Sequence, residues 1–518
     1  MPSSSISLTL SLLLSIAANS QASSPNIVVV MTDDMGFSDL GCFGGEISTP
    51  NLDKLADRGL RLTRCYNAGM CVTSRTSLLT GRWWPEGQRK FERTDLLPEI
   101  LHAAGYRTGL IGKWHLKGHP MDHGFDHFFG FLGGFADHFS GSPDYHLDRK
   151  PFKNFGPNYY SSSSFTDRAI RFVEQTPSEQ PLFLFLAFQA PHNPLQAPTE
   201  DIKRHRGNYT EGWQALRDKR TNRQRELGII GKNTPLPTPP LNLPDWDEIT
   251  PAQRDLEDLR MATYAAMVEI IDRETGRLVD SLERTGRAKD TIFIFLSDNG
   301  SDSFSVADKA MLQRGKLPGE HASNYQPGTG WAYATVAPWR LYKISQHAGG
   351  VTTGAIIHWP KGIRNTGQIQ DEALHFTDFL PTLSDAAGIK TSDSDGFSFL
   401  PLLQGDPWQR DQPMFFQFAD NRAVRTSRHT LVAVDGGKWE LYDSIADPLE
   451  TKDISQSNQA EVARLSAMWE KWWNGQNNGK AYTPKSTANS PHYSPQGDRG
   501  SGKKYIPSAM PKNAPIRR

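Results

Sequence analysis

The chain has 518 residues, more than one compact domain usually holds, so we expect a large domain with a smaller partner. Its 57 Lys and Arg residues balance 57 Asp and Glu residues, and a formal charge of zero provides no field that would attract nucleic acid or an anionic membrane. Cys42, Cys65 and Cys71 are too few for a disulfide framework, although they allow one bridge and one thiol with a special role. We therefore expect a globular protein without a nucleic-acid partner.

The first predicted element is an apolar run at residues 8–18, which is too short to span a bilayer. Ser20, Gln21 and Ala22 follow it and provide the small residues of a signal-peptidase site. We predict a signal peptide over residues 1–22 and an exported protein, periplasmic or secreted. A buried helix is the alternative, because no Lys or Arg precedes the run. No later stretch is long and apolar enough to cross a membrane, so we expect no integral membrane segment in the mature chain.

Short apolar runs then alternate with helical patterns, which predicts an α/β fold with helices on both faces of a sheet. The Val, Ile, Leu and Phe content of these runs is typical of buried strands. Strands are predicted at residues 26–31, 107–112, 182–187, 291–296 and 355–358. The first four lead directly into polar residues. Because ligands collect outside the carboxyl ends of strands in open α/β sheets, we expect a site built from those residues.

Helix signals separate the predicted strands. Thr49 and Pro50 begin one helix and Gly59 ends it, and a second helix is predicted at residues 95–105. Residues 199–250 are polar and dotted with proline around a basic helix. We predict that they form a surface excursion bordering the substrate cleft, followed by a long helix that ends near residue 284. Another capped helix is predicted at residues 378–388.

The alternation of strands and helices stops near residue 400. Residues 412–443 have the pattern of short antiparallel strands, and residues 462–473 that of a helix. We therefore predict a large domain over residues 23–400 and a small α+β subdomain, built on a short antiparallel sheet, over residues 401–474. The polar, basic composition of residues 475–518 predicts an extended or disordered tail.

Acidic residues follow two of the predicted strands. Asp33 and Asp34 come after the first strand, and Asp298 and Asn299 come after the fourth. Carboxylate and amide oxygens suit calcium or magnesium rather than zinc. Asp pairs at strand ends also form turns and helix caps, which is the alternative for each pair alone. Their joint occurrence favours a cation, because crowded carboxylates would otherwise raise one another's pKa.

A second group of residues begins at Cys71 and continues through Thr73, Ser74 and Arg75 into an apolar helix that ends at Gly81. A thiol at a helix N-terminus lies among free backbone N–H groups, which favour an anion and can activate a nucleophile. A small buried hydrophobic residue is the alternative interpretation of this cysteine.

The stretch from Cys71 to Arg82 resembles the signature of the type I sulfatases, C-x-P-S-R followed by A-S-L-L-T-G-R, in which the cysteine is oxidised to formylglycine. Thr73 occupies the position at which the family usually has Pro. Further similar segments are NIVVVMTDDMG, TPNLDKLADRG, IGKWHLKG, HGFD, QAPHNP, LSDNG, HFTDFLPTLSDAAGI and WELYDSIADPLE. The basic helix and PWRLYKISQHAGG are most similar to bacterial arylsulfatases. The family belongs to the alkaline phosphatase superfamily, which implies a large mixed, mostly parallel sheet flanked by helices, with residues 23–400 as the catalytic domain.

The resemblance implies a reaction and the residues that carry it. One calcium ion would be held by Asp33, Asp34, Asp298 and Asn299, with an oxygen of the modified Cys71 or of the bound sulfate. The substrate would be a sulfated small molecule or a glycan, and a formylglycine-generating maturase would be a partner. His115 is the expected base, and His192 and Lys343 would protonate or stabilise the leaving group, with His347 as a substitute for Lys343. The implied catalytic residues are Cys71, Arg75, Lys113, His115, His192 and Lys343.

Two other functions remain as alternatives to sulfate ester hydrolysis. Phosphodiester and phosphonate monoester hydrolases share the transfer geometry, and some of them use the same formylglycine. The segment containing Lys113 and His115 and the arylsulfatase-like segments favour sulfate. A catalytically silent protein that binds sulfated glycans would instead keep Cys71 unmodified.

Overall fold

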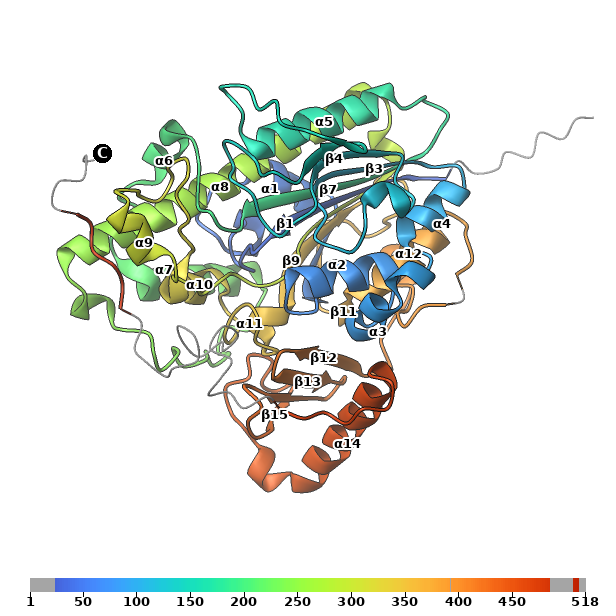
Figure 1. Cartoon of the computed structure of the whole chain (residues 1–518). Coiled ribbons are helices and arrows are strands. Elements are labelled where there is room, and N and C mark those ends of the chain that lie inside the picture. The colour runs from blue at the N-terminus through green and yellow to red at the C-terminus, as the bar shows by residue number, and fades with distance from the viewer. Residues whose placement is uncertain (1–23, 392, 485–505, 512–518) are drawn as a thin grey trace, which may run out of the picture.

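The structure is a computed structural model that describes residues 24–391, 393–484 and 506–511. A large sheet forms its centre (Figure 1). Five of its strands, β8, β1, β7, β3 and β4, run parallel, and β9 runs antiparallel to both β8 and β2. In spatial order the strands are β10 (Gln368–Gln370), β2 (Leu60–Tyr66), β9 (Thr352–His358), β8 (Thr291–Ser297), β1 (Asn26–Asp33), β7 (Leu182–Pro191), β3 (Arg107–Lys113), β4 (His127–Phe131), β5 (Tyr145–Leu147) and β6 (Lys150–Pro151), with β11 (Leu374–His375) also paired to β2.

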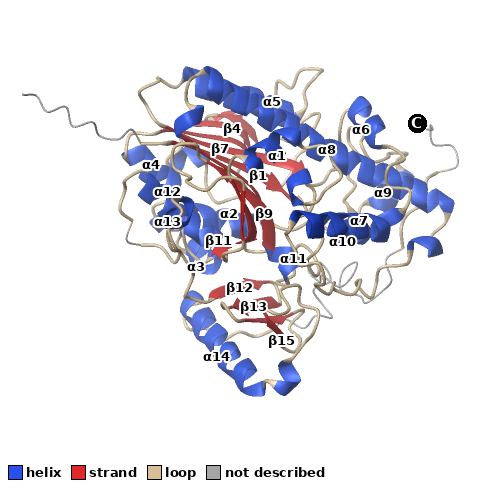
Figure 2. Cartoon of the chain, turned by 180° about the vertical axis from the view of Figure 1, so that it is seen from behind, coloured by secondary structure: helices blue, strands red, loops and turns tan. Residues whose placement is uncertain are grey.

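Helices cover both faces of this sheet (Figure 2). One face packs on α1 (Pro50–Asp57), α5 (Ser161–Gln175) and α8 (Pro251–Arg284), and the other on α2 (Cys71–Thr80), α4 (Leu97–Ala103) and α12 (Phe379–Ala386). Along β1, Val28 and Val30 join the first core, while Ile27 and Val29 join the second. The alternation follows from the two-residue period of a strand. The other helices of the large domain are α3 (Trp84–Arg89), α6 (Thr199–His205), α7 (Gly212–Leu227), α9 (Asp308–Gln313), α10 (Gly328–Thr335), α11 (Ala348–Val351) and α13 (Leu400–Leu403).

A separate antiparallel sheet follows in the C-terminal part of the chain. Its order is β12 (Met414–Phe418), β13 (Asn421–Arg425), β14 (His429–Ala433) and β15 (Glu440–Asp443). Helix α14 (Gln459–Gln476) packs on this sheet through Leu465 and Trp469. Beyond α14, Tyr482 contacts the rings of Trp469 and Trp473, and the Met510 amide donates to the Ala252 carbonyl.

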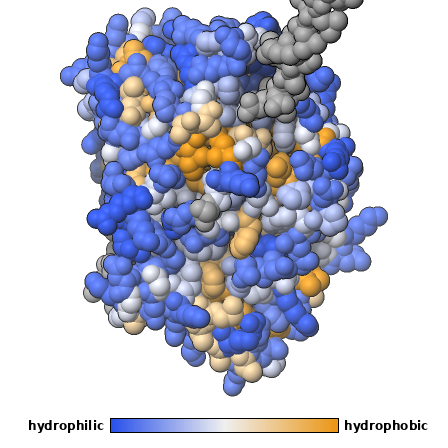
Figure 3. Space-filling model, turned by 90° about the vertical axis from the view of Figure 1, so that its right-hand side faces the viewer, coloured by the Kyte–Doolittle hydropathy of each residue, from blue (hydrophilic) through white to orange (hydrophobic). Residues whose placement is uncertain are grey.

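The predicted fold class is confirmed, and each of the five predicted strands corresponds to a strand of the large sheet. Strand β2 was not predicted, because Arg61 and Arg64 interrupt its apolar pattern. The predicted signal peptide lies outside the described residues, as does most of the predicted tail. Within the described chain, no helix is long and apolar enough to cross a membrane. On the side that carries α4 and α12, the surface is mainly hydrophilic, with small hydrophobic patches (Figure 3).

The basic helix α7 lies at the surface with one face exposed, as predicted for this segment, but its other face is buried and carries Arg217, Arg220 and Gln224. Arg217 donates to the carbonyls of Pro338 at 2.7 Å and Trp339 at 2.9 Å. A buried guanidinium is tolerated when carbonyl or carboxylate oxygens use its N–H groups. Arg217 and Arg220 therefore pack the inner face of α7 into the large domain.

Candidate active site

Five strand ends meet at one edge of the large sheet. Asp33 ends β1, Ser297 ends β8 and Lys113 ends β3. His192 directly follows β7, and a short turn connects β2 to Cys71 at the start of α2. Because the carboxyl ends of parallel strands lie at the same edge, these residues, far apart in sequence, are brought together.

Two buried acid–base pairs form the centre of the site. Lys113 Nζ lies 2.5 Å from Asp33 Oδ2, and Lys343 Nζ lies 2.6 Å from Asp34 Oδ1. Burial alone would raise the pKa of Asp33, but Lys113, His192 and Arg75 lower it overall. Burial would likewise lower the pKa of Lys343, whereas the charge of Asp34 raises it well above its usual value. The Asp33 carboxylate and the Lys343 ammonium group are therefore ionised at neutral pH.

The end of β8 contributes the next two residues. Asp298 Oδ1 accepts from the Asp34 amide at 3.3 Å, and Asp298 Oδ2 accepts from the Arg75 guanidinium at 3.1 Å. Burial and the charge of Asp33 raise the pKa of Asp298 to about 7. Asn299 Nδ2 donates to Asp34 Oδ1 at 2.6 Å. These bonds connect the ends of β1 and β8 directly.

Three buried oxygens of this cluster have no hydrogen-bond partner: Asp33 Oδ1, Asp34 Oδ2 and Asn299 Oδ1. An unpaired buried acceptor is costly, so each indicates a missing partner. Atoms of Asp33, Asp34, Cys71 and His192 all lie within 4.8 Å of one another. The three unpaired atoms are all oxygens, and an oxygen-only set fits a hard divalent cation such as calcium.

Cys71 is the first residue of α2 and is buried. Burial raises the pKa of its thiol to about 12, despite the nearby Lys113 and Lys343. The unmodified side chain is therefore a neutral thiol and a poor nucleophile. Thr73, in the position where Pro is usual, donates from its hydroxyl to the Ala68 and Met70 carbonyls at 2.9 and 2.8 Å. All three cysteines are described by the structure, and all are unpaired.

Two histidines lie beside the acid–base pairs. His192 Nε2 is 3.6 Å from Asp34 Oδ2, and its Nδ1 is 2.7 Å from the Asn193 carbonyl. His115 has a positive φ of 56°, and its buried Nδ1 has no partner. Burial, Lys113 and Arg75 lower the pKa of His115 to about 2, so its ring is uncharged at neutral pH.

The structure distinguishes between Lys343 and its proposed substitute, His347. Lys343 contacts Asp34, whereas His347 Nδ1 lies 2.6 Å from Glu450 Oε2. His347 therefore belongs to the contact with the C-terminal sheet rather than to this cluster. The sequence interpretation missed Asp302, a buried acid that contributes to the charge around Lys343. The sequence could have indicated Asp302, because it is an acidic residue that follows Asn299 by three positions in the loop after the strand end.

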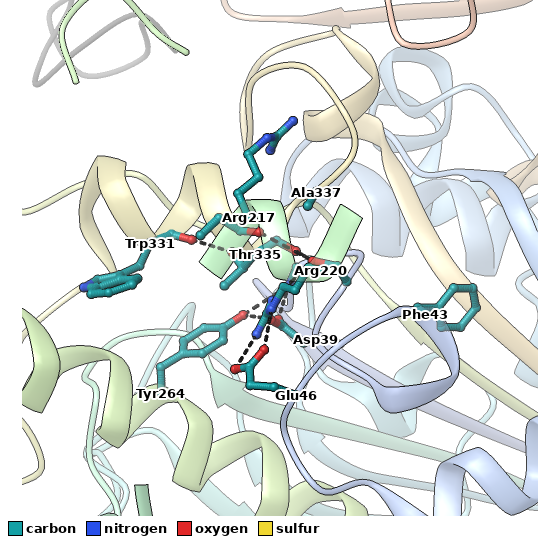
Figure 4. A network of polar contacts seen from close by, with 12 residues as sticks. Asp39, Phe43, Glu46, Arg217, Arg220, Tyr264, Trp331, Thr335 and Ala337 are labelled. Carbon is teal, nitrogen blue, oxygen red and sulfur yellow. Dashed lines mark hydrogen bonds and ion pairs between the residues drawn. The ribbon is translucent and has the colours of Figure 1, made fainter. Parts of the chain in front are cut away.

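A buried polar network lies behind the turn that carries Asp34 (Figure 4). Tyr264 Oη and Asp39 Oδ2 accept from the Gly36 amide at 3.1 and 2.7 Å. Arg220 of α7 donates to Asp39 Oδ1 at 2.6 Å and to Glu46 Oε2 at 2.7 Å. This network ties α7 and α8 to the backbone immediately after the acidic pair.

Comparisons with known proteins agree with this arrangement. The family model described as Sulfatase matches residues 25–389, and the model described as N-sulphoglucosamine sulphohydrolase, C-terminal, matches residues 343–476. An uncharacterised sulfatase of Schizosaccharomyces pombe is 32% identical over 532 residues, covering 88% of this chain and 94% of its own. An arylsulfatase of Klebsiella aerogenes is 34% identical over 414 residues, covering 72% of this chain and 89% of its own.

Solved structures show the same fold. A crystal structure described as Ps i-CgsB in complex with k-i-k-neocarrahexaose superposes with a TM-score of 0.64 at 24% identity, covering 90% of this chain and 96% of that one. This superposition shows that the α/β fold predicted from the sequence is shared with a solved structure. The match of the family model over most of the chain, together with the clustered strand-end residues, shows that the chain belongs to the sulfatase family, enzymes that hydrolyse sulfate esters.

Proposed function

We propose that this sulfatase cleaves a sulfate monoester in the manner of an arylsulfatase, with Cys71 oxidised to formylglycine and one calcium ion held by Asp33, Asp34, Asp298 and Asn299. The substrate is a sulfated small molecule or a glycan. The observation that carries the proposal is the set of three unpaired buried oxygens within the cluster that contains Cys71. Such a set supports a bound cation, which would lie next to the position where the family carries its nucleophile.

Each added group supplies chemistry that the encoded side chains lack. Calcium, when bound, orients the sulfate and offsets charge on its oxygens. Formylglycine at position 71 would supply, in its hydrated form, two hydroxyls on one carbon, an arrangement that suits a nucleophile and that no encoded side chain offers. The raised pKa of the unmodified Cys71 thiol, about 12, supports this modification, because the thiol itself is a weak nucleophile.

The chain's own residues bind the anion and move protons. Lys113, Lys343 and Arg75 surround the cluster with positive charge and stabilise the sulfate oxygens as charge develops on them. His115, whose buried Nδ1 has no partner, would accept a proton from the modified side chain at position 71. His192 and Lys343 stabilise the departing alcohol oxygen.

We further propose that the protein is exported and matured by a formylglycine-generating enzyme. The apolar run at residues 8–18 and the small residues before Ser23 support export. Maturases act on an extended chain, so Thr73 affects recognition before folding. In the folded state the Thr73 hydroxyl is buried and bonded, which shows that the fold accommodates it.

The direct test is peptide mass spectrometry across residues 67–75, combined with kinetics on an aryl sulfate and an aryl phosphodiester. We expect formylglycine at position 71, faster turnover of the sulfate, and loss of turnover on chelation that calcium restores. Cys71→Ala removes turnover, whereas the matched control Cys42→Ala retains it. Faster turnover of the phosphodiester would instead identify a phosphodiesterase. An unmodified Cys71 with glycan binding and no turnover would identify a silent relative.

A further inference from the structure

An aromatic ring lies exposed on the loop between β4 and β5. Phe135 is 54% exposed, although phenylalanine favours the interior. Single exposed apolar residues are common, so exposure by itself indicates nothing. The surroundings of Phe135 distinguish it from the other exposed hydrophobic residues of the described chain.

The residues on both sides of Phe135 are fixed to the rigid part of the fold. The Gly133 amide donates to Asp144 Oδ2 at 2.6 Å. The Ala136 amide donates to Gln189 Oε1 at 3.0 Å, and Gln189 Nε2 donates back to the Ala136 carbonyl at 3.1 Å. Gln189 belongs to β7, three residues before His192. The backbone under the exposed ring is therefore already ordered, which lowers the entropic cost of binding a ligand to it.

The same loop contacts both histidines of the active site. The rings of Phe135 and His192 are stacked, with centroids 6.4 Å apart and an interplanar angle of 23°. At Gly134, an added Cβ would lie 3.0 Å from His115 Nε2, so the backbone there lies against that ring. His192 in turn is 3.6 Å from Asp34, inside the cluster that contains Cys71. From the cluster outward, the order is Asp34, His192 and Phe135.

This order determines which part of the substrate lies next to Phe135 during the reaction. A sulfate held at Cys71 has its alcohol on the side of His192, which stabilises the leaving oxygen in the proposed function. The next surface beyond His192 is the apolar face of Phe135, parallel to the imidazole. Aromatic rings bind other flat, apolar faces in stacked arrangements.

We propose that Phe135 forms one wall of the leaving-group subsite and selects sulfate esters whose alcohol carries a ring with a flat apolar face. The inference rests on the proposed function, because it takes the sulfate to be bound at Cys71. The ring is either aromatic or the apolar face of a pyranose. Phe135 is thus a specificity residue for the alcohol, while the sulfate is bound by the groups around Cys71.

The test measures binding in a Cys71→Ala background, which separates recognition from turnover. Calorimetry compares phenyl sulfate, a pyranose sulfate and methyl sulfate, with and without Phe135→Ala. We expect the added substitution to weaken at least one of the two ring-bearing esters by about three- to tenfold. Methyl sulfate should change by less than about twofold, since it has no ring to stack. Which ring-bearing ester responds identifies the leaving group as aromatic or pyranose.

Two further variants check the interpretation. Phe135→Trp retains a stacking face and should restore the affinity for the responsive ring ester, whereas Phe397→Ala removes another exposed phenylalanine and should change nothing. Equal weakening of all three esters would overturn the inference, because it would mean that Phe135 only supports His192. Unchanged affinities would overturn it as well. Separately, a protein that carries formylglycine at position 71 and binds calcium but hydrolyses no sulfate ester would refute the proposed function, whatever the binding data show.

Discussion

Replacing Arg220 by methionine tests whether the buried network behind the acidic turn stabilises the fold. Methionine keeps most of the side-chain volume and removes the charge. Arg220 contacts Asp39, Glu46 and Ser38 with distances from 2.6 to 3.2 Å. Removing one partner of a buried ion pair leaves an uncompensated charge and costs about 3–5 kcal/mol of unfolding free energy. We expect a loss in this range at pH 8.

The loss of unfolding free energy caused by Arg220→Met should depend on pH, and the pKa of Asp39 determines in which direction. Burial raises the pKa of Asp39 to about 6, against the lowering effects of Arg220 and Tyr264 and with a small raising effect of Glu46. The wild-type protein therefore loses stability as pH rises from 3.8 to about 6, because the buried carboxyl must ionise. Without Arg220 the pKa is higher still, so the variant continues to lose stability above pH 6. The difference between the two proteins should thus be larger at pH 8 than at pH 5.5.

The assay is urea unfolding of the full chain at both pH values. Arg223→Met is the matched control, since Arg223 is on the same helix but 55% exposed and paired only with Glu226. An exposed pair contributes about 0.2–1 kcal/mol, so this control should stay near the wild type. The assignment of a stabilising buried pair would be refuted if Arg220→Met lowered the free energy of unfolding no more than Arg223→Met does. It would also be refuted if the decrease were the same at both pH values.

Three further predictions follow from other parts of the structure. Asn299→Leu removes an unpaired oxygen from the proposed calcium set and should weaken calcium binding at least about tenfold by calorimetry, and an unchanged affinity would exclude Asn299 as a ligand. Burial would raise the pKa of Glu450, but Arg425 and His347 lower it from 4.5 to about 2. The pairing therefore stabilises the protein fully above pH 4.5, and this stabilisation is lost as the pH falls from 4.5 to about 2. The full effect is about 3 kcal/mol, and Glu450→Gln should flatten the stability profile measured over that range by unfolding. Thr73→Pro should raise the formylglycine fraction in peptide mass spectra, and a lower fraction would show that the maturase for this chain does not favour proline there.

The sequence predicted those parts of the fold in which local pattern and burial agree. β1, β7 and β8 are buried along their whole length, so their continuous apolar runs were sufficient to identify them. β2 was missed because Arg61 and Arg64 are only partly buried, and its strand is supported by neighbours more than 280 residues away in sequence. The basic helix α7 was predicted, but its buried face was not, for a related reason. Arg217 and Arg220 are buried against carbonyls and carboxylates of other segments, and no local pattern reveals such partners.

The residues of the candidate site also fall into those that the local sequence could predict and those that it could not. Asp33, Asp34, Asp298 and Asn299 could be predicted to lie together, since each follows a strand and parallel strands share an edge. Lys343 came only from the family resemblance, because its contact with Asp34 spans 309 residues and it lies on a loop without a strand signal. Phe135 carried no signal at all, since a phenylalanine in a glycine-rich loop is not distinguished from a core residue until its neighbours are known.

In the proposed function, the pairing of acids with bases would allow one site to bind both a cation and an anion. Asp33 and Asp34 each give one oxygen to a lysine and keep the other unpaired, so a metal ion does not have to displace Lys113 or Lys343. An ammonium group has three donors, and one carboxylate uses only one of them in each pair. Each lysine therefore keeps N–H donors that are available to an anion. In the proposed function the carboxylates would serve two purposes, and removing one of them should disturb anion binding together with cation binding.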